Sequence, residues 1–147
     1  MKRAMNNKEV KEFVEKMVYG LSFSKKDHFD KDDNVILINN EPMFFFHEDK
    51  LIPTIKLLLK NSILKKITVD MGAVRFVASG ADIMRPGIKE IDEGIQKDDF
   101  VSVVDINNKK PLAVGQALFS GEEMLHMTSG KVIKNLHYVG DKVWGYH

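Results

Sequence analysis

The chain has 147 residues with 44% hydrophobic side chains, and its 22 basic side chains stand against 21 acidic ones. This composition is typical of a folded protein with one or two domains, and it excludes a largely disordered chain. The balanced charge excludes a global field that would attract nucleic acid, so any such site has to be a local patch. The absence of cysteine excludes disulfides, thiolate metal sites and a cysteine nucleophile.

The N-terminal stretch predicts a helix rather than a targeting segment. Residues 1–10 are polar and lack the apolar centre of a signal peptide, and no run of about 20 apolar residues follows. We therefore expect a cytoplasmic protein. Apolar side chains then recur at helical spacing, with Asn6 or Asn7 as candidate caps and Gly20 as the candidate end. The apolar positions are Val10, Phe13, Val14, Met17 and Val18.

A polar loop and a hairpin are expected next. Residues 25–34 resemble a calcium loop only in their spaced Asp residues, because the glycine and the distal Glu of such a loop are missing. The runs 35–38 and 43–47 predict two strands joined by a turn at 39–42. Phe44, Phe45 and Phe46 are consecutive, so at least one of them must pack on the opposite side of its strand.

A second helix is predicted to begin at Glu48 or Asp49, with Pro53 in its first turn. Its apolar face would contain Leu51, Ile55, Leu58 and Leu59. The order helix, hairpin, helix defines a small α/β domain over residues 1–65.

From Ile67 onward the periodicity changes to that of strands, which favours a compact barrel. The runs are 67–69, 73–78, 100–106, 112–119, 132–139 and, more weakly, 142–146. Residues 107–111 predict a hairpin turn. Residues 122–127 fit either one helical turn or a loop.

The stretch Ser79 to Ile88 predicts a strand end, a short helical turn and a tight bend. Gly80 and Gly87 lack a Cβ, so the backbone can take positive φ there and a partner can approach the main chain. Backbone N–H groups at such a turn also suit an anion. The alternative is that both are ordinary turn glycines.

Five blocks in order give this half of the chain a family resemblance. They are Val69 to Val74, Gly80 to Ile88, Asp98 to Val101, Ala113 to Gly115 and His137 to Trp144. Together they resemble a PUA domain over about residues 66–145. The last block and the N-terminal half resemble archaeal relatives of the malignant-T-cell-amplified translation factor, in which a pre-PUA domain precedes the PUA domain.

The resemblance implies an α+β fold, with a small α/β pre-PUA domain over 1–65 and a PUA-like mixed β pseudo-barrel over 66–147. It implies RNA as the partner, either tRNA at its acceptor end or small-subunit ribosomal RNA, with the small ribosomal subunit and a translation-factor protein as further partners. The expected RNA-binding residues are Gly80, Ala81, Asp82, Met84, Arg85, Pro86, Gly87 and His137, with phosphate contacts from Arg75, Arg85, Lys89 and Lys131.

Other chemistry finds little support in the sequence. The five His residues lack metal-ligand spacing, no catalytic constellation is present, and no cofactor is expected. Tyr138 and Trp144 are candidates for base stacking, although an indole more often closes a small core. Residues 66–147 carry ten bases and eleven acids. Because each phosphate contact needs a cation, a protein-interaction adaptor with little autonomous RNA affinity is the alternative to an RNA-binding protein.

Overall fold

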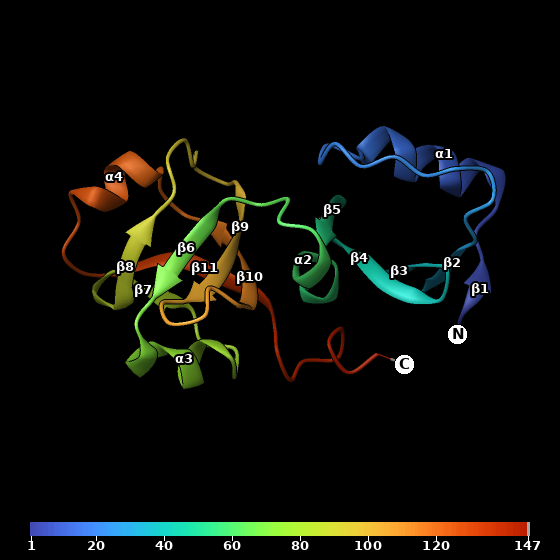
Figure 1. Ribbon diagram of the computed structural model, residues 1–147. Helices are drawn as coiled ribbons and strands as arrows, with labels where there is room; N and C mark the ends of the chain where they lie inside the picture. The colour runs from blue at the N-terminus through green and yellow to red at the C-terminus, as the bar shows by residue number, and fades with distance from the viewer. Residues whose placement is uncertain (147) are drawn as a thin grey trace.

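The computed structural model describes residues 1–146, which form two units side by side (Figure 1). The N-terminal unit, residues 1–65, is built on a five-stranded sheet in the order β1-β2-β3-β4-β5. The barrel unit, residues 66–146, is built on a six-stranded sheet in the order β7-β11-β10-β9-β6-β8. Helix α2 lies between the two sheets, and the C-terminal segment runs past α2 toward the N-terminal unit.

The elements of the N-terminal unit are β1 (Arg3–Ala4), α1 (Asn7–Lys16), β2 (Phe29–Asp32), β3 (Val35–Ile38), β4 (Glu41–His47), β5 (Lys50–Pro53) and α2 (Ile55–Lys60). Neighbouring strands of this sheet are antiparallel. Phe13 of α1 is fully buried against aromatic rings of the sheet. As predicted, the consecutive phenylalanines diverge: Phe44 packs with Phe13, and Phe45 packs toward the barrel unit.

The elements of the barrel unit are β6 (Lys66–Val69), α3 (Met71–Val77), β7 (Ile83–Met84), the 3₁₀ turn η1 (Arg85–Gly87), β8 (Ile88–Ile91), β9 (Phe100–Asp105), β10 (Pro111–Ala117), α4 (Gly121–Leu125) and β11 (Lys131–Tyr138). Strands β6 and β9 are parallel, and the other pairs are antiparallel. Because η1 joins β7 to β8, the two ends of the strand order, the sheet nearly closes. The fold is α+β with a mixed β pseudo-barrel, as expected. Helices α3 and α4 lie at opposite ends of it (Figure 1).

A β-bulge in β11 aims successive side chains at the N-terminal unit. Val114 of β10 pairs with His137 and Gly115 pairs with Asn135, so Leu136 is an extra residue in the ladder. Leu136 and His137 both face the N-terminal unit, whereas Asn135 faces α3. A Cβ on Gly115 would lie 2.4 Å from Ile133 Cγ2, so glycine is required opposite the bulge.

Two predicted elements have a different secondary structure. Residues 73–78, predicted as a strand, form most of helix α3 and its C-cap Ala78, because the Asp70 side chain caps the start of the helix by accepting from the Ala73 N–H at 2.9 Å. Residues 50–53, predicted as helix, form β5. Glu48 and Asp49 both have positive φ and make a tight turn that pairs β5 with β4.

Other elements begin or end at residues that differ from the predicted ones. The loop predicted over 25–34 contains β2, whose Asp30 is buried beside His28. Helix α1 ends at Lys16 rather than near Gly20, and Val14 and Val18 are exposed rather than packed. Residues 142–146 form turns instead of a strand. No helix among residues 1–146 is long and apolar enough to span a membrane.

Candidate nucleic-acid interface

Most of the predicted site residues lie around the two ends of α3. The Asp70 N–H at the start of the helix donates to the Gly87 carbonyl at 2.9 Å, which brings η1 against α3. A Cβ on Gly87 would lie 3.3 Å from the Ala73 Cβ, so the backbones approach closely at this point. Pro86 beside it is exposed.

The turn after α3 is held by strand β11. Asn135 donates from its side-chain amide to the carbonyls of Val77 and Ala81, both at 3.0 Å, and from its backbone to Asp82 Oδ1 at 2.8 Å. Gly80 has a φ of +107°, and a Cβ there would lie 2.9 Å from the Tyr138 ring. The Gly80 turn, residues 78–82, is therefore fixed in position before any ligand binds.

Exposed apolar side chains lie on α3 and β7, the two elements that this turn connects. The side chains are half-exposed at Met71 (46%) and Phe76 (52%) of α3 and at Met84 (50%) of β7. Ala81 is exposed as well. Unpaired bases stack on such apolar faces, so the surface suits single-stranded RNA better than a duplex.

The predicted phosphate-binding cations are only partly gathered here. Arg75 is exposed on α3 with its guanidinium over the Phe76 ring, 4.8 Å from the centroid. Lys131 begins β11 opposite Met84, and its Nζ lies 3.4 Å from Asp82 Oδ2. Lys89 is exposed on β8, which follows η1. Arg75 and Lys131 contact residues of the Gly80 turn region, through the Ser79 hydroxyl bonded to the Arg75 carbonyl and through the pair of Lys131 with Asp82.

Arg85 does not present its side chain to a phosphate as predicted. Its Nε donates to the Met124 carbonyl at 2.6 Å, and its Nη1 donates to the Ile88 carbonyl at 3.3 Å. A bidentate phosphate contact needs two free donors on one edge of the guanidinium. The side chain is half-buried and ties η1 to the end of α4, which is a structural role.

His137 also differs from its prediction as an RNA-facing residue, because its side chain is fully buried between the units. Its Nε2 accepts the Ile55 N–H at 3.1 Å, and its Nδ1 lies 2.7 Å from Asp141 Oδ2. These contacts require a neutral ring with its proton on Nδ1. The ring also packs edge-on against Phe45. His137 therefore joins the two units.

The C-terminal segment completes this junction. Burial by itself raises the pKa of Asp141, but the hydrogen bonds from His137 and from the Trp144 and Tyr138 N–H groups hold that pKa below its ordinary value. The Trp144 ring packs on the apolar cluster between the units, with Lys56 Nζ 5.5 Å from its centroid. Of the two uses predicted for Trp144, packing is the one seen.

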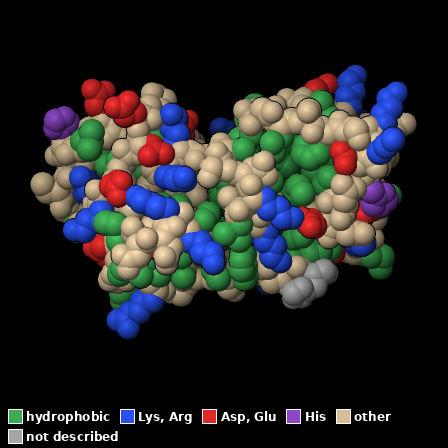
Figure 2. Space-filling model, in the orientation of Figure 1, with side chains coloured by type: hydrophobic (Ala, Val, Ile, Leu, Met, Phe, Trp, Pro, Cys, Tyr) green, Lys and Arg blue, Asp and Glu red, His purple; other side chains and the backbone are tan. Residues whose placement is uncertain are grey.

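A cleft opens between the two units, visible as the notch at the top of Figure 2. Its volume is about 530 Å³. Residues from both units line it, among them Tyr19, Leu51, Leu64 and Phe100, with lysine and aspartate side chains of mixed sign at the rim. This mixture of charges gives the cleft no preference for a polyanion.

Sequence reasoning missed three contributors to the interface. Met71 and Phe76 were not selected because their segment was assigned to a strand, whereas helical spacing would have placed Met71 and Arg75 on one exposed face. Asn135 gives no sequence signal, because its partners Val77 and Ala81 lie more than 50 residues away.

Comparison with known proteins agrees with this architecture. The PUA domain model matches residues 65–139, and the model called Domain of unknown function (DUF1947) matches residues 2–61. An uncharacterized protein of Methanocaldococcus jannaschii is 53% identical over 78% of this chain and 72% of its own length. A hypothetical protein from Pyrococcus horikoshii OT3, whose crystal structure is known, is 34% identical with a TM-score of 0.83 over 99% of this chain and 98% of that one.

Eukaryotic relatives match over a smaller share of their length. Translation machinery-associated protein 20 of Schizosaccharomyces pombe is 35% identical over 73% of this chain and 62% of its own. Malignant T-cell-amplified sequence 1 of Rattus norvegicus is 34% identical over 75% of this chain and 63% of its own. The chain thus matches less than two thirds of these relatives. It belongs to the PUA-domain proteins, in the group that carries a DUF1947 (pre-PUA) region before the PUA domain and includes the malignant T-cell-amplified and Tma20 proteins.

Proposed function

We propose that this protein is a non-catalytic RNA-binding protein of the translation machinery that acts in the cytoplasm. Its ligand is the acceptor end of tRNA or a single-stranded part of small-subunit ribosomal RNA, and the small ribosomal subunit and a translation-factor protein are its further partners. The domain boundaries that go with this proposal are 1–65 for the pre-PUA domain and 66–147 for the PUA domain.

One observation supports the proposal most directly: the Gly80 turn is pre-organised on an exposed, partly apolar edge. Asn135 and Tyr138 hold the turn, and Arg75 stands beside it. Pre-organisation lowers the cost in conformational entropy that the binding contacts must offset. The relatives named for translation support the cellular process, and PUA membership supports RNA as the ligand.

The balanced charge of the barrel unit limits the expected affinity. Few free cations surround the turn, so few phosphates are neutralised and the dependence of affinity on salt is shallow. Selectivity then has to come from shape and from stacking on exposed bases rather than from charge.

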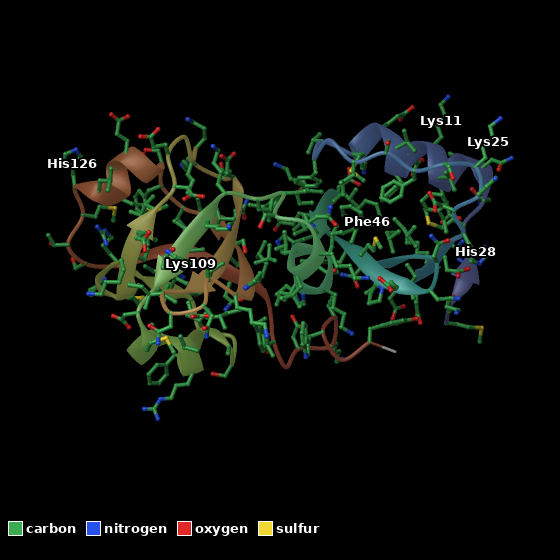
Figure 3. All side chains as sticks on the ribbon, viewed as in Figure 1. Lys11, Lys25, His28, Phe46, Lys109 and His126 are labelled. Carbon is green, nitrogen blue, oxygen red and sulfur yellow. The ribbon has the colours of Figure 1, made fainter. Side chains whose placement is uncertain are left out.

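The test is binding of the protein to uncharged tRNA and to the same tRNA without its single-stranded 3′ end, over a salt series. We expect trimming to lower the affinity, with a shallow salt slope for the intact tRNA. Arg75→Gln and Lys131→Gln should each lower the affinity. Lys11→Gln is the matched control, because Lys11 lies on α1 at the far end of the N-terminal unit (Figure 3). Equal affinity for both tRNAs would overturn acceptor-end recognition.

A second candidate, a protein-interaction adaptor, rests on helix α1. The segment 43–46 that first motivated it is buried or half-buried, so it offers no docking patch. Val14 of α1 and Val18, which lies just beyond the end of the helix, are instead 57% and 78% exposed. A protein that binds neither tRNA nor small-subunit RNA at low salt, yet still associates with ribosomes, would favour this candidate over RNA binding.

A further inference from the structure

Phe76 is unusual among the aromatic residues of this protein because it is left in solvent. Its side chain is 52% exposed, whereas every other aromatic side chain between residues 1 and 146 is buried or half-buried. Moving a phenylalanine ring out of water is favourable, so an exposed ring can stabilise the binding of a partner that covers it.

The backbone that carries the ring is fixed by its neighbours. It belongs to the last turn of α3, where the Phe76 carbonyl accepts the Ala81 N–H at 2.9 Å and the Ser79 hydroxyl at 3.1 Å. The same hydroxyl donates to the Arg75 carbonyl at 2.8 Å. Phe76 and Arg75 are therefore anchored directly to the Gly80 turn rather than to a separate part of the surface.

Arg75 supplies a charge beside the ring. Its guanidinium stands over Phe76, 4.8 Å from the ring centroid, and no acidic side chain of residues 1–146 forms a salt bridge with it. A cation over a ring still exposes its N–H groups at its edge, where they can donate to a phosphate. An aromatic face next to a free guanidinium matches the repeating chemistry of a single-stranded nucleic acid, in which a base and a phosphate alternate.

We propose that Phe76 is a stacking platform for one unpaired base and that Arg75 contacts a phosphate next to that base. This inference rests on the proposed RNA-binding function and specifies it: the ligand needs an unstacked base at the Gly80 turn. A continuous duplex offers no free base face, so it is rejected. Phe76 thus sets the preference for single-stranded RNA, while Arg75 holds the RNA backbone in position through the neighbouring phosphate.

The experiment uses the full chain and a short RNA hairpin with a single-stranded 3′ overhang in which 2-aminopurine replaces each overhang base in turn. The blunt hairpin is the comparison ligand. Phe76→Leu keeps an apolar side chain and removes the ring, Phe76→Trp keeps stacking, and Arg75→Gln removes the charge. Leu125→Ala is the matched control, because Leu125 is 61% exposed on α4 at the opposite end of the barrel.

We expect the fluorescence of one overhang position to be quenched by the wild type and by Phe76→Trp, and not by Phe76→Leu. The affinity of Phe76→Leu should fall roughly fivefold or more with an unchanged salt slope. Arg75→Gln should make the salt slope shallower by about 0.7. Leu125→Ala should bind as the wild type does.

The possible failures are distinguishable. If the wild type binds the overhang and Phe76→Leu binds equally well, the stacking inference is wrong and the proposed function stands. If the wild type binds the blunt hairpin as tightly as the overhang, the single-strand preference is wrong. If the wild type binds neither RNA at low salt, the proposed function fails and the inference fails with it.

Discussion

Gly80 occupies a place where both the backbone and the space exclude a side chain. Its φ is +107°, and an added Cβ would lie 2.9 Å from the Tyr138 ring. We expect Gly80→Ala to lower the free energy of unfolding by about 1–3 kcal/mol, measured by chemical denaturation. Gly130→Ala is the control, because Gly130 has a φ of +92° but no atom within 4 Å of its added Cβ. Equal losses for the two variants would show that the Tyr138 ring moves aside freely.

Asp141 makes the free energy of unfolding depend on pH in the acid range. Its pKa is lower in the folded protein than in the unfolded chain, because three donors bond its carboxylate despite its burial. The unfolded chain therefore takes up a proton first as pH falls, so this stabilisation is present above about pH 4 and is lost below it. We expect the wild type and Asp141→Asn to differ in free energy of unfolding at pH 7, and this difference to shrink as the pH falls below about 4. A difference that is independent of pH would contradict this account.

The role of an individual residue was predicted well where local backbone conformation determines it, and poorly where partners distant in the sequence determine it. Gly80 lies in a turn with a positive φ, which the missing Cβ of glycine permits. This preference of glycine can be recognised in the sequence. Arg85 and His137 were predicted to contact RNA because the family resemblance implies it, and an arginine also suits a bidentate phosphate contact. Their actual partners, the Met124 carbonyl and the Ile55 N–H, lie 39 and 82 residues away in the chain.

At the scale of elements, helix α2 is capped from both units. Thr54 accepts the Leu57 N–H at 3.2 Å, and His137 of β11 accepts the Ile55 N–H at 3.1 Å. His137→Ala leaves a buried N–H without an acceptor and a void beside Phe45. We expect a loss of roughly 2–4 kcal/mol in the free energy of unfolding, with faster hydrogen exchange at the Ile55 amide.

The control for this change is His126→Ala. His126 is exposed on the α4 side of the barrel unit, far from α2 (Figure 3), so its removal should alter stability by less than about 0.5 kcal/mol. If exchange at the Ile55 amide were the same in both variants, the capping role of His137 would be wrong.

Elements with strong periodicity were predicted correctly, and short elements near turns were not. Strands β9, β10 and β11 have long apolar or alternating runs, and the four residues of β3 are all apolar. Helix α3 has seven residues whose apolar content equally fits a strand, and the deciding signal was the Asp70 cap. Strand β5 was assigned to a helix because the positive φ of Glu48 and Asp49 has no sequence signature as clear as that of Asn-Gly.

At the scale of the whole molecule, we expect the contacts of the junction to make the units tumble as one body. The Trp144 ring packs on the apolar cluster between them and lies against Lys56. We expect Trp144→Ala to loosen this contact at a loss of about 2 kcal/mol, so that the units tumble with different rotational correlation times in NMR relaxation. Leu125→Ala, an exposed truncation away from the junction, should leave one common correlation time. A common value in Trp144→Ala would show that the other contacts suffice.

The change of periodicity near Ile67 coincides with the start of the second sheet, and the barrel was predictable from strand spacing and the family blocks. The geometry of the junction was not. It depends on contacts such as those of His137 with Ile55 and of Tyr146 with Asp32, which are 82 and 114 residues apart. No local pattern encodes such a pairing.

The extra residue in β11 gives the chain an uneven tolerance to length changes. Leu136 has no partner position in the ladder, and Asn135 before it faces the Gly80 turn while His137 after it faces α2. Deleting Leu136 would restore regular alternation, and His137, which would then follow Asn135 directly, would still face the junction. Elsewhere a deletion within a strand turns every later side chain to the opposite face of the sheet. Here, the same deletion would remove the apolar contact of Leu136 at the junction and leave the side chains on either side of it facing as they do now.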